Sequence, residues 1–164
     1  MNKTILAETP HCQHGHDQCV SDALAAAEQV CEHAGARLTA LRKRVLELVW
    51  QSHRPMGAYD LLEILAREDD RQPAPPTIYR ALDFLQEHGL VHRIASLNAF
   101  IGCASPEHTH QGHFLICRNC RVAFELDQSM IQPAITRVAR QMNFAVETET
   151  VEIAGLCADC QEAA

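Results

Sequence analysis

Apolar residues recur with the spacing of an amphipathic helix through most of the first half of the chain. This spacing predicts four helices, over residues 21–35, 39–52, 58–67 and 76–89. Thr39 suits the N-cap of the second helix, while Gly35 and Gly89 suit the ends of the first and the fourth. Short helices followed directly by a β-hairpin are typical of a winged helix-turn-helix domain, which we therefore expect here.

Two short apolar runs after the fourth helix predict the hairpin. Its strands cover residues 90–95 and 99–103, with Leu97 and Asn98 as a two-residue turn. In that register His92 lies directly opposite Cys103, and both side chains are on the same face.

The pattern changes after residues 104–112, which we assign to a hinge or linker. We expect strands at His113–Cys117 and 122–126, a helix with Pro133 in its first turn, and a strand at 145–153. The helix would turn Ile135, Val138, Ala139 and Met142 inward. The predicted class is therefore α+β. A flexible tail (1–20), a winged-helix domain (21–103) and the linker precede a C-terminal metal-binding and dimerisation domain (113–164).

Composition and charge narrow the function. The chain has 164 residues, 47% of them hydrophobic, which predicts a folded core in one or two domains. It shows neither an apolar stretch that could span a bilayer nor a secretory leader, so a cytoplasmic location without membrane association is expected. The net charge of −7 disfavours nucleic-acid binding by the chain as a whole, but basic residues are concentrated in 37–54 and acidic residues in 96–164.

Cysteines carry the strongest chemical indication. There are eight, which in the cytosol favours metal binding or redox chemistry over disulfides. Cys117, Cys120, Cys157 and Cys160 form two Cys-x-x-Cys pairs, a spacing typical of a four-thiolate zinc site. The alternative is two redox dithiols or buried free thiols, but the pairs are expected on a hairpin turn and at a strand end rather than at a helix start. A zinc ion with four protein ligands has no open position, so we expect it to be structural.

A second candidate site combines His92, Cys103, His110 and Glu125. Nitrogen, sulfur and oxygen donors together suit zinc, and the soft thiolate of Cys103 disfavours magnesium, calcium and manganese. Alternatively, His92 is a surface residue of the wing, Cys103 a buried thiol and Glu125 solvated. His108 and His113 lie close enough in sequence to replace His110.

The fourth helix carries candidate DNA contacts on its outward face. Thr77, Tyr79 and Arg80 lie near its N-terminal end, which enters the major groove in helix-turn-helix proteins. Arg37, Arg42 and Lys43 are candidates for phosphate contacts. The alternative is a solvated helix face. In the tail, His11, Cys12, His14, His16 and Cys19 are either a further metal cluster or disordered, and the sequence favours disorder.

Several longer motifs resemble one known family across residues 21–162. They are Arg37-Leu-Thr39, Ala58-Tyr59-Asp60-Leu61-Leu62, Pro76-Thr77-Ile78-Tyr79-Arg80-Ala81-Leu82, Gly89-Leu90-Val91-His92, His113-Phe-Leu-Ile-Cys117 with Cys120, and Gly155-Leu-Cys157 with Cys160. Through them the chain resembles the ferric uptake regulator family, and most closely its zinc uptake regulator branch.

The resemblance implies a homodimer with a structural zinc on the four cysteines. It implies a second, regulatory zinc on the His92, Cys103, His110 and Glu125 set, and DNA contacts from Tyr59, Thr77, Tyr79 and Arg80. Iron-sensing and peroxide-sensing members often carry Asp within the His-rich segment before the first cysteine pair, whereas His108-Thr-His110-Gln-Gly-His113 has none.

The expected function is a zinc-responsive repressor, not an enzyme. It would bind two zinc ions per chain and the palindromic double-stranded DNA operators of zinc-acquisition genes. The alternatives are an iron, manganese or peroxide sensor of the same fold, a zinc hydrolase with Glu125 as general base, and a structural zinc adaptor.

Overall fold

A computed structural model describes residues 16–52, 54–68, 74–106 and 110–163 of the chain. These residues form two compact units, which we call the N-terminal unit (16–106) and the C-terminal unit (110–163). Among them, no helix is long and apolar enough to cross a membrane.

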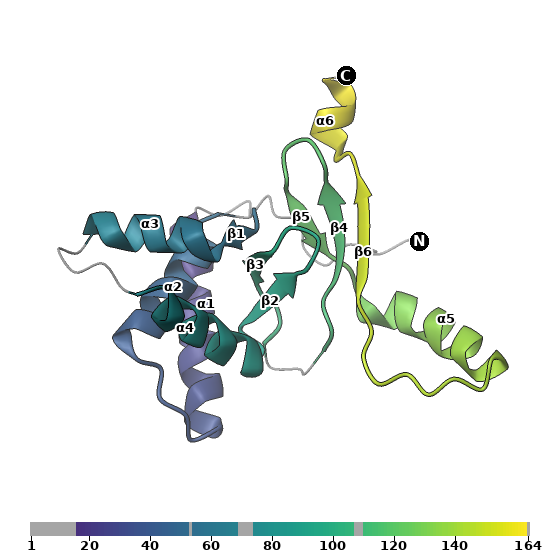
Figure 1. Cartoon of the computed structure of the whole chain (residues 1–164), viewed down its shortest axis with the longest axis horizontal. Helices are drawn as coiled ribbons and strands as arrows, with labels where there is room; N and C mark the ends of the chain where they lie inside the picture. The colour runs from purple at the N-terminus through teal and green to yellow at the C-terminus, as the bar shows by residue number, and fades with distance from the viewer. Residues whose placement is uncertain (1–15, 53, 69–73, 107–109, 164) are drawn as a thin grey trace. The chain divides into compact units, whose positions relative to one another are not determined.

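The N-terminal unit is built from four helices and a small sheet (Figure 1). The helices are α1 (His16–His33), α2 (Ala40–Trp50), α3 (Ala58–Glu68) and α4 (Pro75–Glu87). The strands are β1 (Met56–Gly57), β2 (Val91–Ile94) and β3 (Ala99–Gly102), and the sheet order is β1-β3-β2. This arrangement is the predicted winged helix-turn-helix, with the short β1 as an element that the sequence did not predict.

The predicted periodicity accounts for the core of this unit. The apolar stripes of α2, α3 and α4 supply most of the buried side chains, including Val45, Leu48, Leu61, Ile78 and Leu82, all at most 1% exposed. Thr39 caps α2 as predicted: its hydroxyl accepts a hydrogen bond from the Arg42 amide at 3.4 Å.

The first helix begins earlier than predicted, at His16 rather than Ser21. Asp17 lies in its first turn, where a carboxylate favours the helix N-terminus. The Gln18 amide also donates to the Asp22 carboxylate one turn later at 2.7 Å. Five residues assigned to the tail are thus helical.

The predicted hairpin register was wrong by two residues. Ile94 pairs with Ala99, so the connection is the four-residue segment 95–98, and His92 lies opposite Ile101 rather than Cys103. A two-residue type I′ turn needs positive φ at both central residues. Only Asn98 has it (φ 47°), because a branched residue such as Leu97 is disfavoured there. A slip of two preserves the side-chain face, so Cys103 lies on the face of His92, diagonally across the pair.

The C-terminal unit contains β4 (His113–Cys117), β5 (Ala123–Glu125), α5 (Gln128–Gln141), β6 (Val151–Gly155) and α6 (Ala158–Glu162). The central strand β4 pairs antiparallel with β5 and parallel with β6, as Figure 1 shows. The strand predicted at 145–153 begins only at Val151, because the ladder with β4 starts where Val151 meets His113. The short helix α6 was not predicted.

The helix of the C-terminal unit also differs from the prediction. It begins at Gln128 because Asp127 is its N-cap and accepts from the Ser129 amide at 2.8 Å, which places Pro133 inside the helix rather than in its first turn. The expected inward burial is only partly met: Ile135 and Ala139 are half-buried, but no residue of α5 is fully buried, and Val138 and Met142 are 52% and 76% exposed. Phe144 and Ile153 add to the exposed apolar surface of this unit.

Candidate metal centres and DNA-contacting surface

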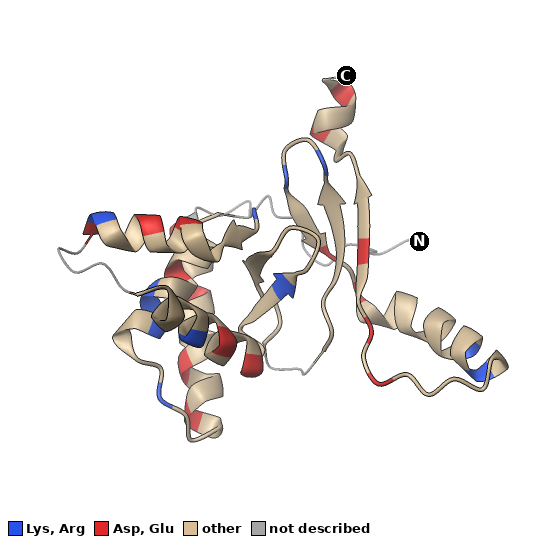
Figure 2. Cartoon of the chain, viewed as in Figure 1, with Lys and Arg blue, Asp and Glu red and all other residues tan. Residues whose placement is uncertain are grey.

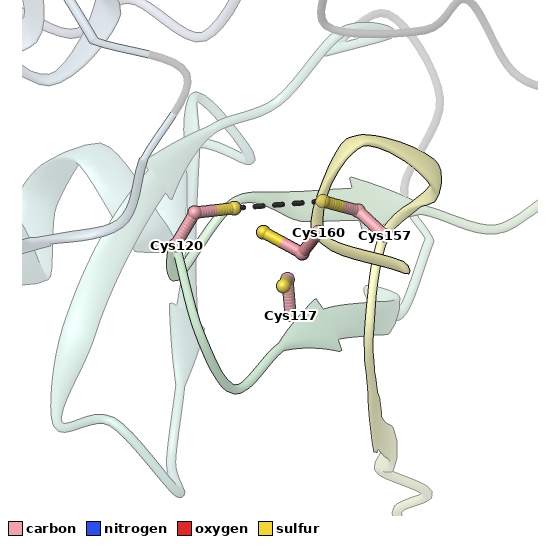
Figure 3. Close-up of side chains that lie close together, drawn as sticks. All are labelled: Cys117, Cys120, Cys157 and Cys160. Atoms are coloured by element: carbon pink, nitrogen blue, oxygen red, sulfur yellow. Dashed lines mark hydrogen bonds between the residues drawn. The ribbon is translucent and has the colours of Figure 1, made fainter. Parts of the chain in front are cut away.

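The four cysteines of the paired motifs converge in the C-terminal unit (Figure 3). Cys117 ends β4 and Cys120 lies in the turn toward β5, while Cys157 caps α6 and Cys160 lies in its first turn. Their sulfur atoms all lie within 4.8 Å of one another, and the Cys120 and Cys157 sulfurs are 3.6 Å apart. Tetrahedral zinc with bonds of about 2.3 Å places its sulfur ligands roughly 3.8 Å apart. The four thiols therefore fit a zinc ion.

The thiols of this cluster differ in how readily they ionise. The pKa of Cys117 is lowered to about 6, because the backbone N–H groups of Cys157 and Cys120 donate to its sulfur. The pKa of Cys157 is instead raised to about 12: the Cys160 N–H lowers it, but burial and the neighbouring thiols outweigh that effect. Four sulfurs this close cannot all carry a negative charge unless a cation is bound among them. A metal ion would supply that positive charge.

The prediction that the second Cys pair lies away from a helix start was wrong. The second Cys pair does lie at the start of a helix that follows a strand, since Cys157 is the N-cap of α6. What distinguishes this cluster from a redox dithiol is that both pairs meet at one point.

The wing carries the first half of the second candidate site. Within the N-terminal unit, a ring nitrogen of His92 and the Cys103 sulfur lie within 4.8 Å of each other. Cys103 is buried at 3% exposure, directly after β3. Same-face placement therefore brings the two donors together even though they are not directly opposite.

The C-terminal unit carries the second half. The His110 Nε2 atom lies 2.7 Å from the Glu125 Oε1 atom, and both side chains are largely buried. His113, which could have replaced His110, is fully buried and pairs instead with Glu149, at 3.2 Å from Nε2 to Oε1. His108 falls outside the described residues. Within this unit, the structure thus favours His110 as the partner of Glu125.

The predicted DNA-contacting residues lie on the surface of the N-terminal unit. Thr77, Tyr79 and Arg80 are exposed in the first turns of α4, and Tyr59 at the start of α3 is 71% exposed. Arg37 is also exposed.

Two further basic residues are engaged within the protein. The Arg42 guanidinium stacks 3.5 Å from the centre of the Phe84 ring and donates to the Arg37 carbonyl oxygen at 2.6 Å. Lys43 pairs with Glu28 at 2.7 Å. Arg42 and Lys43 therefore link α2 to the neighbouring helices α4 and α1. Figure 2 shows that α1 carries several acidic residues along its length.

Comparison with known proteins identifies the family. The family model described as the ferric uptake regulator family matches residues 33–154. The chain belongs to the ferric uptake regulator family. It is 39% identical over 140 residues to the zinc uptake regulation protein of Escherichia coli (strain K12), covering 85% of this chain and 81% of that protein. The protein of the same name from Mycobacterium tuberculosis (strain H37Rv) is 29% identical over 131 residues, covering 78% of this chain and 97% of that protein.

Solved structures agree with this assignment. A zinc uptake regulator in complex with zinc and DNA matches with a TM-score of 0.81 at 38% identity, covering 88% of this chain and 96% of that one. The holo form of XcZur matches with a TM-score of 0.76 at 39% identity, covering 86% and 98%. The predicted α+β fold and the predicted family are confirmed.

The sequence did not predict the contacts that Asn119 and Trp50 make near the two candidate sites. The Asn119 side chain donates to the Cys160 sulfur at 3.2 Å, a contact between the two Cys pairs. The position of Asn119 within Cys117-Arg-Asn-Cys120 is the sequence feature that could have indicated this contact. Trp50 packs against Gly102, beside Cys103. A glycine within a strand often marks such a close approach.

The histidine and cysteine cluster of the tail is only partly visible. His11, Cys12 and His14 lie outside the described residues, as does the His16 side chain. Cys19 lies in α1 and is half-buried.

Proposed function

We propose that this chain is a zinc-responsive transcriptional repressor that acts in the cytoplasm as a homodimer on double-stranded DNA operators. The observation that carries the proposal is the Cys103 thiol beside His92 on the wing of a DNA-binding fold. It supplies a soft sulfur ligand where an oxygen-only site would favour magnesium, calcium or manganese. The similarity to a zinc uptake regulator bound to zinc and DNA supports the same function.

The chain would bind two zinc ions. We assign a structural ion to Cys117, Cys120, Cys157 and Cys160, and a regulatory ion to His92, Cys103, His110 and Glu125. The convergence of the four thiols supports the first, and the two donor pairs, one within each unit, support the second.

The regulatory set gives the zinc response its physical basis. His92 and Cys103 belong to the N-terminal unit, whereas His110 and Glu125 belong to the C-terminal unit. Joint ligation by all four residues would restrict the relative positions of the winged helix (21–103) and the metal-binding domain (113–164) across the linker (104–112). Zinc then shifts the population toward the DNA-binding arrangement if the ligands bind it more tightly in that arrangement.

DNA would be contacted by the exposed residues of α3 and α4. Arg80 is suited to bidentate hydrogen bonds with guanine, with Thr77 and Tyr79 beside it. Tyr59 and Arg37 would contact the DNA backbone. A dimer places two such helices on two half-sites, which explains a palindromic operator. Genes for zinc acquisition are the expected targets.

The exposed apolar surface of the C-terminal unit supports dimerisation. Val138 of α5, Met142 and Phe144 just after that helix, and Ile153 of β6 are each 47–76% exposed. Figure 2 shows that the charged residues of α5, Arg137 and Arg140, are confined to one end of the helix. We assign these exposed apolar side chains to the interface of the homodimer.

The alternatives differ at identifiable residues. An iron, manganese or peroxide sensor would not need the Cys103 thiolate. A zinc hydrolase would need Glu125 as a general base at an open zinc position, whereas Glu125 pairs with His110 in the structure.

The experiment that tests the proposal is DNA-binding anisotropy at buffered free zinc, with wild type and Cys103→Ser on a palindromic site. We expect zinc to tighten wild-type binding by more than roughly tenfold, about 1.4 kcal/mol of coupling, and to leave Cys103→Ser nearly unchanged. Equal affinity with and without zinc in both proteins would refute the sensor and leave a structural zinc adaptor or another metal.

A further inference from the structure

Gly102 has an unusually close neighbour. It is the last residue of β3 and directly precedes Cys103. A methyl group at Gly102 would lie 2.3 Å from Cε2 and 2.4 Å from Nε1 of Trp50, the single tryptophan of the chain. The indole therefore occupies the space that the side chain of any other residue would need.

The contact lies on the opposite face of the hairpin from the ligands. Gly102 pairs with Val91, and Val91 and Phe100 on that face belong to the hydrophobic core. Trp50 ends α2 and packs against the same core. Because successive side chains of a strand alternate between faces, Cys103 points away from Trp50, toward the face of His92.

The helix that carries the indole cannot easily move back. Trp50 follows Val45, Leu48 and Val49, which anchor α2 in the core at 0–1% exposure. Ordinary contact begins at 3.4 Å, so a methyl group at Gly102 would displace the indole or the strand by about 1 Å. Metal–ligand distances tolerate only about 0.2 Å. A shift of this size one residue before Cys103 is thus large on the scale of the site.

We propose that the Trp50–Gly102 contact positions Cys103, which makes Gly102 and Trp50 positioning residues of the regulatory zinc site. The inference rests on the proposed function of that site. It explains why the strand ends in glycine: only a residue without a side chain lets the strand approach the indole closely enough to set the cysteine backbone.

The four-cysteine cluster provides a matched control. Gly155 ends β6, two residues before Cys157, and a methyl group there would meet no atom within 4 Å. Gly102→Ala and Gly155→Ala thus make the same chemical change at the end of a strand, near one candidate site each, and only the first creates a clash.

The test is zinc binding by the full chain in competition with a chromophoric chelator. Gly102→Ala is expected to weaken binding of the regulatory zinc by roughly tenfold to 100-fold, which is the range seen for residues that orient metal ligands. Binding of the structural zinc is expected to stay unchanged. Gly155→Ala is expected to match wild type at the second zinc. Circular dichroism melting checks that each variant is folded.

A second variant keeps the test decisive if Gly102→Ala folds poorly. In Gly102→Ala combined with Trp50→Leu, the methyl group has room, and the second zinc is expected to regain most of its affinity. Wild-type affinity in folded Gly102→Ala would overturn the positioning role and leave the regulatory site intact. A double variant as weak as Gly102→Ala would overturn it too, since the indole would not be the cause. A wild type that binds only one zinc would overturn the regulatory site and this inference together.

Discussion

The two candidate metal sites differ in where their donors come from. The four-cysteine cluster lies entirely in the C-terminal unit, on the β4–β5 turn and at the start of α6. The proposed regulatory site takes His92 and Cys103 from the N-terminal unit and His110 and Glu125 from the C-terminal unit. Zinc bound within one unit stabilises that unit, whereas zinc bound by residues of two units makes their relative position depend on zinc concentration.

The two sites also differ in the types of ligand atom that they offer. Four thiolates surround zinc completely and bind it tightly, which suits an ion that stays with the folded protein. The second set has a single thiolate beside two imidazoles and a carboxylate. Such a site can exchange its ion as the free zinc concentration changes.

The largest expected effect comes from breaking the four-cysteine cluster. Cys157→Ser should remove the structural zinc and with it the cooperative unfolding of the C-terminal unit, because binding free energy at such a site is folding free energy. Zinc content by mass spectrometry and melting by circular dichroism measure both. The matched control is Cys31→Ser, which changes a buried cysteine of α1 outside the cluster. Retention of both zinc ions by Cys157→Ser would contradict the structural assignment.

A smaller effect is expected at the regulatory site. Glu125→Gln removes the carboxylate beside His110 and should weaken the second zinc by roughly tenfold to 100-fold, with the structural zinc retained. DNA binding should then need correspondingly more free zinc, measured by anisotropy. Glu147→Gln removes the same charge from an exposed position of the same unit and should behave as wild type. An unchanged zinc response in Glu125→Gln would exclude Glu125 as a ligand.

Changing a DNA contact should separate zinc binding from operator binding. Arg80→Ala is expected to weaken specific DNA binding by about 1–3 kcal/mol at saturating zinc, the worth of a bidentate arginine–guanine contact. Both zinc affinities should be unchanged, as the chelator competition would show. If Arg80→Ala altered zinc binding instead, the division between DNA contacts and metal ligands would be wrong.

The smallest effect concerns the N-terminal unit alone. Thr39→Ala removes the N-cap of α2 and should lower the free energy of unfolding of this unit by about 1 kcal/mol. Thr39→Ser retains the hydroxyl and should recover most of the loss. Denaturation followed by Trp50 fluorescence reports on this unit, since the only tryptophan lies at the end of α2. A changed content of structural zinc would show that the two units are not independent in stability.

Local sequence determined the elements whose stability is local. Helical periodicity and caps predicted α2, α3 and α4 to within a few residues, because those patterns act within a few turns of one helix. The doubled Cys-x-x-Cys spacing predicted the four-thiol cluster, since each pair is already close within its own turn. The register error at His92 did not separate it from Cys103, because a slip of two residues keeps both side chains on one face.

Tertiary structure decided what depends on distant partners. The parallel pairing of β4 with β6 set where β6 begins. The pattern of α5 predicted an apolar face, but only the packing of the unit decided that Val138 on this helix stays exposed. Asn119 reaches Cys160 only because two distant segments meet. Likewise, the contact of Trp50 with Gly102 joins residues far apart in sequence, and no spacing rule connects a helix end to a strand end. Such contacts are fixed by packing of the whole unit, so only the folded structure reveals them.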